Sequence, residues 1–164
     1  MNCERAIERH HSDYGGKPEG ILIFELHTGT GFSCGEPNRI DAFWMADTPS
    51  KGLRRIAYEI KVSRSDFQRE IKDPRKRRAA LRVSNQFFFV TPKGLLKPEE
   101  IPLECGLKEM NDDGNLITVV DAPYRDGLPA SWHFFAAFAR RLLRENRSAA
   151  APSSAAPQAG RKDR

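Results

Sequence analysis

Two short segments with alternating side chains constrain the fold of this chain more than any other feature. Residues 39–45 and 56–62 each place apolar side chains at every second position, which is typical of a strand that buries one face. The residues of this apolar face are Ile40, Ala42, Trp44, Ile56, Tyr58, Ile60 and Val62. Residues 47–52 between the segments are rich in turn formers, so we expect a hairpin centred on Ser50.

The same hairpin predicts that two acidic side chains meet. Asp41 would lie directly across from Glu59, and both would point away from the apolar face, as would Lys61. Mg²⁺ and Mn²⁺ prefer carboxylate oxygens as ligands, together with backbone carbonyls and water. A divalent ion makes its bound water a better nucleophile and stabilises charge on phosphate oxygens. The pattern therefore indicates a metal site for phosphodiester hydrolysis, in which Lys61 would reach the phosphate or orient the water.

Further ligands are expected close to this pair. Glu25 lies in an expected strand over residues 21–28, and its parity lets it face the same side as Asp41, so it is a candidate ligand and catalytic residue. The backbone carbonyl of Ile60 is another candidate ligand. Alone, an E-x-K tripeptide would be a weak signal, because alternating charges usually mark a solvated strand face. Asp41 at a spacing compatible with a hairpin strengthens it, as do the apolar opposite faces.

A basic cluster follows the second segment. Its members are Lys72, Arg75, Lys76, Arg77, Arg78 and Arg82. A nucleic-acid surface of this kind would contact phosphates without reading the base sequence. The alternative is an exposed helix face, partly neutralised by neighbouring acidic residues. We assign four of these side chains to the phosphate backbone, with Lys76 as the first choice to reach the site and Lys72 as the second; the other two are Arg75 and Arg78.

The remaining pattern predicts an α/β or α+β domain with a mixed central sheet and flanking helices. The expected elements are helices over 3–13 and 65–82, strands over 21–28 and 86–91, a hairpin pairing 106–110 with 116–120, and a last helix from about residue 131. Ser65 and Gln68 form a capping box for the second helix, which Asp73-Pro74 interrupts. The last helix is expected to bury Phe135, Phe138 and Leu142.

Length and composition favour one cytoplasmic domain. The chain has 164 residues, and we expect a single domain over 1–147 followed by a disordered Ala/Pro/Ser-rich tail over 148–164. Three scattered cysteines favour a reducing compartment, and no apolar run approaches a membrane span. The net charge of +5 is compatible with a polyanionic partner.

The order helix, strand, strand with Asp41, strand with Glu59 and Lys61, helix, strand resembles the core of the PD-(D/E)XK nuclease superfamily, which has the restriction-endonuclease-like fold. On this match Asp41 corresponds to the aspartate of the motif, and Glu59 and Lys61 to its E-x-K. The longer segment 58–67 resembles a group of small bacterial and prophage-encoded proteins within that superfamily, some of them linked to DNA repair. The first acidic position stays open between Glu25 and Glu8.

The resemblance implies a Mg²⁺- or Mn²⁺-dependent deoxyribonuclease that acts in DNA repair, phage DNA processing or defence. One alternative is a non-catalytic nucleic-acid-binding or adaptor protein on the same scaffold. Another is a protein-interaction module whose charges are merely surface. DNA is the expected partner, and a homodimer is compatible with this kind of enzyme. The preferred DNA structure, and the choice between endonuclease and exonuclease action, stay open.

Overall fold

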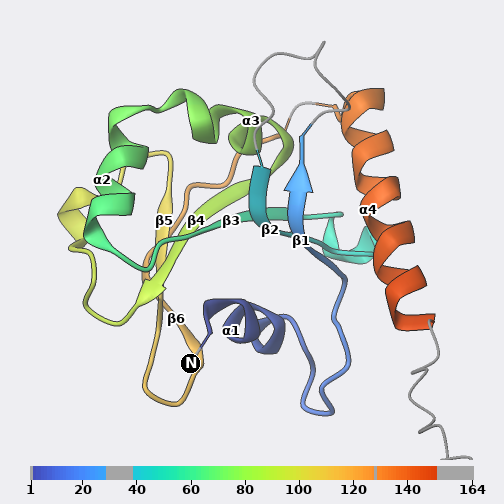
Figure 1. The fold of residues 1–164 in the computed structure, drawn as a ribbon, viewed down its shortest axis with the longest axis horizontal. Helices are drawn as coiled ribbons and strands as arrows, with labels where there is room; N and C mark the ends of the chain where they lie inside the picture. The colour runs from blue at the N-terminus through green and yellow to red at the C-terminus, as the bar shows by residue number, and fades with distance from the viewer. Residues whose placement is uncertain (1, 29–38, 128, 151–164) are drawn as a thin grey trace, which may run out of the picture.

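The computed structural model describes residues 2–28, 39–127 and 129–150. This part of the chain contains six strands and four α-helices (Figure 1). The strands are β1 (Ile21–His27), β2 (Arg39–Met45), β3 (Arg55–Ile60), β4 (Gln86–Pro92), β5 (Gly106–Met110) and β6 (Leu116–Val120). The α-helices are α1 (Cys3–His10), α2 (Arg64–Lys72), α3 (Arg75–Val83) and α4 (Trp132–Ala150), and short 3₁₀ turns occur at Pro49–Lys51 and Pro98–Glu100.

All six strands form one mixed sheet in chain order. β1, β2 and β3 are antiparallel neighbours, β3, β4 and β5 are parallel neighbours, and β6 returns antiparallel to β5. Parallel neighbours need a crossover connection, and α2 and α3 supply the one between β3 and β4. The architecture confirms the expected α+β class with a mixed sheet.

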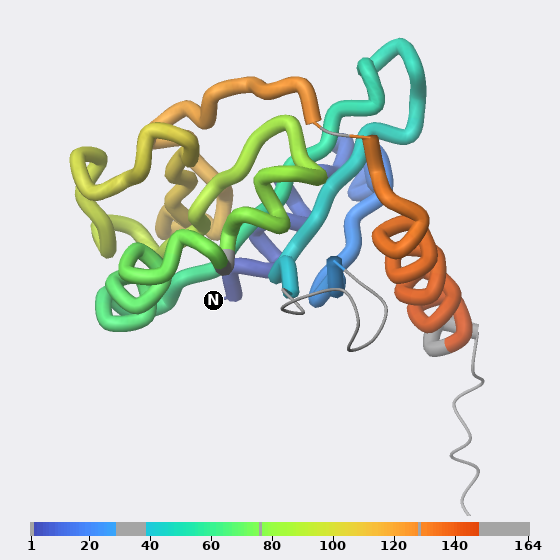
Figure 2. Tube along the Cα trace, turned by 90° about the horizontal axis from the view of Figure 1, so that it is seen from above, coloured from blue at the N-terminus to red at the C-terminus, as the bar shows by residue number. Residues whose placement is uncertain are grey.

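Helices cover both faces of this sheet (Figures 1 and 2). α1 lies against one face, where Ala6 and Ile7 pack with Tyr58 and Phe88. α2, α3 and α4 cover the other face of the sheet. Its buried residues include Phe67, Ala80, Phe134, Phe138, Phe43, Ala57 and Phe89. The carboxyl end of β3 therefore emerges from a core packed on both faces of the sheet, and three residues connect it to α2.

Several expected elements are confirmed. The hairpin of β5 and β6 has the predicted bounds, and β4 covers the predicted apolar run. The predicted helix is broken at Asp73-Pro74, since α2 ends at Lys72 and α3 begins at Arg75. We expected Asp73 to cap the second part, but Pro74 is the N-cap residue of α3; the backbone N–H of Arg75 still donates to Asp73 Oδ1 at 3.3 Å.

The capping box predicted for α2 is wrong by two residues. Ser63 is the N-cap, because its Oγ accepts a hydrogen bond of 3.2 Å from the backbone N–H of Asp66. Ser65 lies inside the helix. β3 accordingly ends at Ile60, and Val62, which we expected on the buried face, is 69% exposed.

The predicted alternation also fails near the start of β2. Ala42 and Trp44 pack on the α1 side, but Ile40 packs on the opposite side with Leu26. The neighbouring strand changes face at the same level, where Glu25 adopts a positive φ of 51°. A residue in this left-handed conformation interrupts the extended backbone, so the side chains beyond it reverse their faces.

The last helix differs from expectation at both ends. α4 buries Phe134 and Phe138, whereas Phe135, which we expected in the core, is exposed. The helix also extends to Ala150 and takes in the first three residues of the predicted tail; the rest of that tail, 151–164, lies outside the described residues. Across the described ranges, no helix combines the length and apolar character needed to cross a membrane.

Candidate active site

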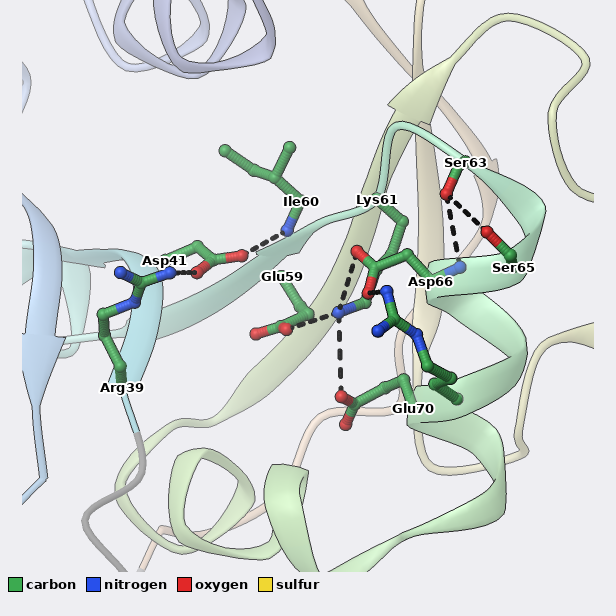
Figure 3. A network of polar contacts seen from close by, with 10 residues as sticks. Arg39, Asp41, Glu59, Ile60, Lys61, Ser63, Ser65, Asp66 and Glu70 are labelled. Atoms are coloured by element: carbon green, nitrogen blue, oxygen red, sulfur yellow. Dashed lines mark hydrogen bonds and ion pairs between the residues drawn. The ribbon is translucent and has the colours of Figure 1, made fainter.

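The β2–β3 hairpin brings Asp41 and Glu59 together. Ala42 pairs with Tyr58 and Phe43 with Ala57, which is the register expected for a hairpin centred on Ser50. The backbone N–H of Ile60 donates a hydrogen bond of 3.0 Å to Asp41 Oδ2 (Figure 3). This bond fixes one oxygen of Asp41 against the next strand and directs the carboxylate towards the segment that carries Glu59.

Lys61 completes the cluster expected from sequence. Its Nζ atom lies 2.7 Å from Glu59 Oε1, and its side chain is only 6% exposed. The backbone N–H of Lys61 also donates to Val90 O at 2.9 Å, so both ends of the residue are held. The three residues of the sequence motif are thus adjacent in space.

Two more carboxylates surround the same ammonium, and neither was expected at the site from the sequence. Glu70 Oε2 lies 3.6 Å from Lys61 Nζ, and Asp66 Oδ2 lies 3.8 Å from it (Figure 3). Both residues come from α2, four positions apart, and therefore share one helix face. Two acidic residues four positions apart, on the helix directly after the E-x-K segment, were the signal in the sequence that could have pointed to them.

Glu25 does not enter the cluster directly. Its side chain is 57% exposed and accepts a hydrogen bond of 3.1 Å from Arg39 Nη1. Arg39 Nη2 in turn lies 3.5 Å from Asp41 Oδ1. Glu25 therefore reaches the site through Arg39, another residue that the sequence analysis missed although it precedes Asp41 by one strand period. Glu8 is exposed on α1, across the sheet from α2, and is not brought to Asp41.

The carboxylates give the site surplus negative charge. Burial raises the pKa of Glu59 to about 7, and the nearby Asp41 adds to this rise, while Lys61 opposes it. For Lys61, burial lowers the pKa, but the attraction of Glu59, Glu70 and Asp66 outweighs burial and leaves the pKa above its ordinary value. Lys61 therefore stays a cation, and another cation beside Glu59 would relieve the remaining repulsion.

The donor set fits a hard divalent cation. Among the residues that the structure describes, no group of three or more His, Cys, Asp or Glu side chains is placed to hold a metal ion. An ion at this centre would have Asp41 and Glu59 as its candidate side-chain ligands, and the carbonyl of Ile60 as a candidate third ligand. Mg²⁺ is commonly bound by one or two carboxylates, with waters and phosphate oxygens filling its other positions.

The basic residues after the site divide into two kinds. Lys72, Arg75 and Arg78 are exposed, and Arg75 Nε lies 2.9 Å from Asp73 Oδ1. Arg77 is buried, with Nη2 2.7 Å from Glu104 Oε1, so its role is structural. The side chain of Lys76, our first choice for phosphate contact, lies outside the described residues.

Comparison with known proteins finds a similar fold but no role. No family model and no curated protein match this chain. The structure is similar to that of SPO1766, described as a protein of unknown function from Silicibacter pomeroyi, with a TM-score of 0.60 and 22% identity over 93% of this chain and 94% of that chain. At this identity the similarity concerns the fold alone.

Proposed function

We propose that the chain is a Mg²⁺-dependent deoxyribonuclease with a restriction-endonuclease-like core of the PD-(D/E)XK type. The observation that carries the proposal is the convergence of Asp41, Glu59 and Lys61 at the end of β3. The chain order α1, β1, β2, β3, α2, β4 supports it, because that is the order expected of such a core.

Each residue of the site then has a chemical role. Asp41 and Glu59 hold the divalent ion, with the Ile60 carbonyl as a further ligand. When bound, Mg²⁺ makes a coordinated water more acidic and offsets charge on the phosphate. Lys61 neutralises charge that develops on the phosphate or orients the attacking water. Glu25 assists from outside the cluster, because its ion pair with Arg39 offsets part of the positive charge that would compete with the ion for Asp41.

Cations on α2 and α3 supply the proposed DNA surface. We assign the phosphate backbone to Lys72, Arg75, Lys76 and Arg78. Lys72 is exposed on α2, the helix that also carries Asp66 and Glu70. Contacts of this kind give affinity that is independent of base sequence and falls steeply with salt.

The test is a digestion panel of linear, nicked, branched and single-stranded DNA with and without Mg²⁺. Wild type should cleave at least one substrate only with Mg²⁺ or Mn²⁺, whereas Asp41→Ala and Lys61→Ala should not. Asp112→Ala is the matched control, because this exposed acid of the β5–β6 turn pairs only with Lys93 among the described residues. Cleavage that survives both site substitutions would refute the proposed site.

One observation favours the non-catalytic alternative. Lys61 already neutralises Glu59, since their charged atoms lie 2.7 Å apart, and such a pair can persist in a scaffold that binds DNA without cutting it. Salt-dependent DNA binding without cleavage of any substrate would support this adaptor. A protein-interaction module would show no salt-sensitive DNA affinity.

A further inference from the structure

Glu70 is as deeply buried as the lysine it faces. Its side chain is 5% exposed and that of Lys61 is 6% exposed, and the charged atoms lie 3.6 Å apart. Asp66 is a weaker partner for the same ammonium: it lies at 3.8 Å, is 39% exposed and is shared with Arg69 at 3.3 Å. Besides Glu59, Glu70 is therefore the carboxylate best placed to hold Lys61.

The position of Glu70 is fixed by the packing of α2. Ser63 caps the helix, and Phe67 anchors it in the core by packing edge-to-face against Phe89, with ring centroids 5.2 Å apart. Glu70 follows Phe67 by three residues, which places it on a neighbouring part of the buried helix face. A carboxylate held by a packed helix keeps its place even when other ligands of the lysine move.

Stability alone does not explain this buried pair. Taking two charges out of water is costly, and replacement of a buried ion pair by apolar residues is often neutral or stabilising. The position of Glu59 suggests a functional reason for the buried pair of Lys61 and Glu70. Its Oε1 atom binds Lys61 Nζ, and the same carboxylate faces Asp41 on its other side (Figure 3). A divalent ion on Glu59 would weaken its hold on the ammonium.

From this geometry we infer that Glu70 is a positioning residue, which holds the Lys61 ammonium beside the scissile phosphate while Glu59 ligates the metal. The inference rests on the proposed nuclease function. Glu70 touches neither metal nor phosphate in this scheme. Its effect on cleavage should therefore pass entirely through Lys61.

A double-mutant cycle tests this dependence. Single-turnover cleavage with saturating Mg²⁺ is measured for wild type, Glu70→Gln, Lys61→Met and the double variant, and Mn²⁺ affinity is measured for each by calorimetry. Glu70→Gln should slow wild-type cleavage by roughly ten-fold or more and leave Mn²⁺ affinity within about two-fold. In the Lys61→Met background, Glu70→Gln should change the residual rate by less than about two-fold. Asp66→Asn, the more exposed and more distant acid, should slow cleavage less than Glu70→Gln does.

The outcomes separate the inference from the function on which it rests. Equal slowing by Glu70→Gln in both backgrounds would overturn the positioning role but leave the nuclease intact. Absence of metal-dependent cleavage by wild type would overturn both. Should Glu70→Gln fail to fold, Glu70→Asp replaces it, because it keeps the charge but retracts it by one methylene. A partial loss of rate that depends on Lys61 would then support the inference, and a rate equal to wild type would overturn it.

Discussion

The backbone N–H of Ile60 donates a 3.0 Å hydrogen bond to Asp41 Oδ2, so β2 contacts β3 at the residue between Glu59 and Lys61. The middle residue of the segment Glu59-Ile60-Lys61 is thus tied to one aspartate on the neighbouring strand. Because Oδ2 is held by the backbone, Oδ1 is the oxygen left facing Arg39. The geometry of Asp41 is fixed before any ligand arrives, which lowers the cost of binding one.

Arg39 should compete with a divalent ion for Asp41. Its guanidinium lies 3.5 Å from Asp41 Oδ1, in a partly exposed pair worth no more than about 1 kcal/mol. Arg39→Gln should therefore tighten Mn²⁺ binding by about two- to five-fold, which calorimetry can measure. Glu25→Gln, which removes the other partner of Arg39, should weaken binding slightly. Weaker Mn²⁺ binding by Arg39→Gln would show that Arg39 supports the ion.

The stability of the metal-free protein should depend on the protonation of Glu59. Burial and Asp41 raise the pKa of this carboxyl from 4.5 to about 7, so the folded protein holds the proton more tightly than the unfolded chain does. This contribution is complete below about pH 4.5 and is lost as the pH rises through about 7. With chelator present, the free energy of unfolding should fall by on the order of 1–3 kcal/mol between pH 5 and pH 8 because of this group.

Urea unfolding at both pH values, for wild type and Glu59→Gln, measures that contribution. The fall should be smaller in Glu59→Gln, which cannot ionise at this position. Mg²⁺ should stabilise wild type more at pH 8 than at pH 5, because a ligating carboxylate must be deprotonated. Parallel pH profiles for the two proteins would contradict the assignment of a raised pKa to Glu59.

Removal of the Lys61 charge should destabilise the fold as well as slow cleavage to a small residual rate. Lys61→Met leaves Glu70 buried without its cation, and breaking such a pair costs about 3–5 kcal/mol. Adding Glu70→Gln should restore more than half of the lost stability, since no buried charge then lacks a partner, but it should not restore cleavage. Urea unfolding of the single and double variants checks this, and an additive loss in the double variant would contradict the pairing.

Two neighbouring arginines of α3 should behave differently. Arg78 is exposed, so Arg78→Ala should weaken DNA binding to all sequences alike and reduce the slope of affinity against salt by about one, with little effect on stability. Arg77 is buried against Glu104, so Arg77→Ala should lower stability by roughly 2–4 kcal/mol. Filter binding over a salt series and thermal unfolding distinguish them. A loss of stability in Arg78→Ala but not in Arg77→Ala would contradict the structural role of Arg77 and the surface role of Arg78.

The sequence predicted the parts of the site that depend on strand pairing. Asp41 meets Glu59 because the hairpin register follows from the turn and the alternating side chains. Lys61 follows Glu59 at strand spacing, and its amine reaches the same carboxylate. These relationships are local, since fewer than 25 residues separate the partners along the chain.

The parts that it missed depend on tertiary geometry or local backbone conformation. Glu70 reaches Lys61 because the buried side chain of Phe67 packs α2 against the sheet. The pattern of apolar residues alone does not show which polar residue of the helix faces the end of a strand. Glu25 is displaced by a positive φ, which strand periodicity cannot reveal in a residue other than glycine. The face of Ile40 was wrong for a related reason, since β2 follows the irregularity of β1.

Calorimetric titration of Mn²⁺ into wild type, Asp41→Asn and Glu59→Gln, at pH 8 and without DNA, tests the central claim most directly. Wild type should bind one ion per chain at these carboxylates, and each substitution should weaken that binding by roughly ten-fold or more. Glu25→Gln should remain close to wild type. Undetectable binding by wild type, or affinity unchanged by both substitutions, would contradict a shared metal site between β2 and β3.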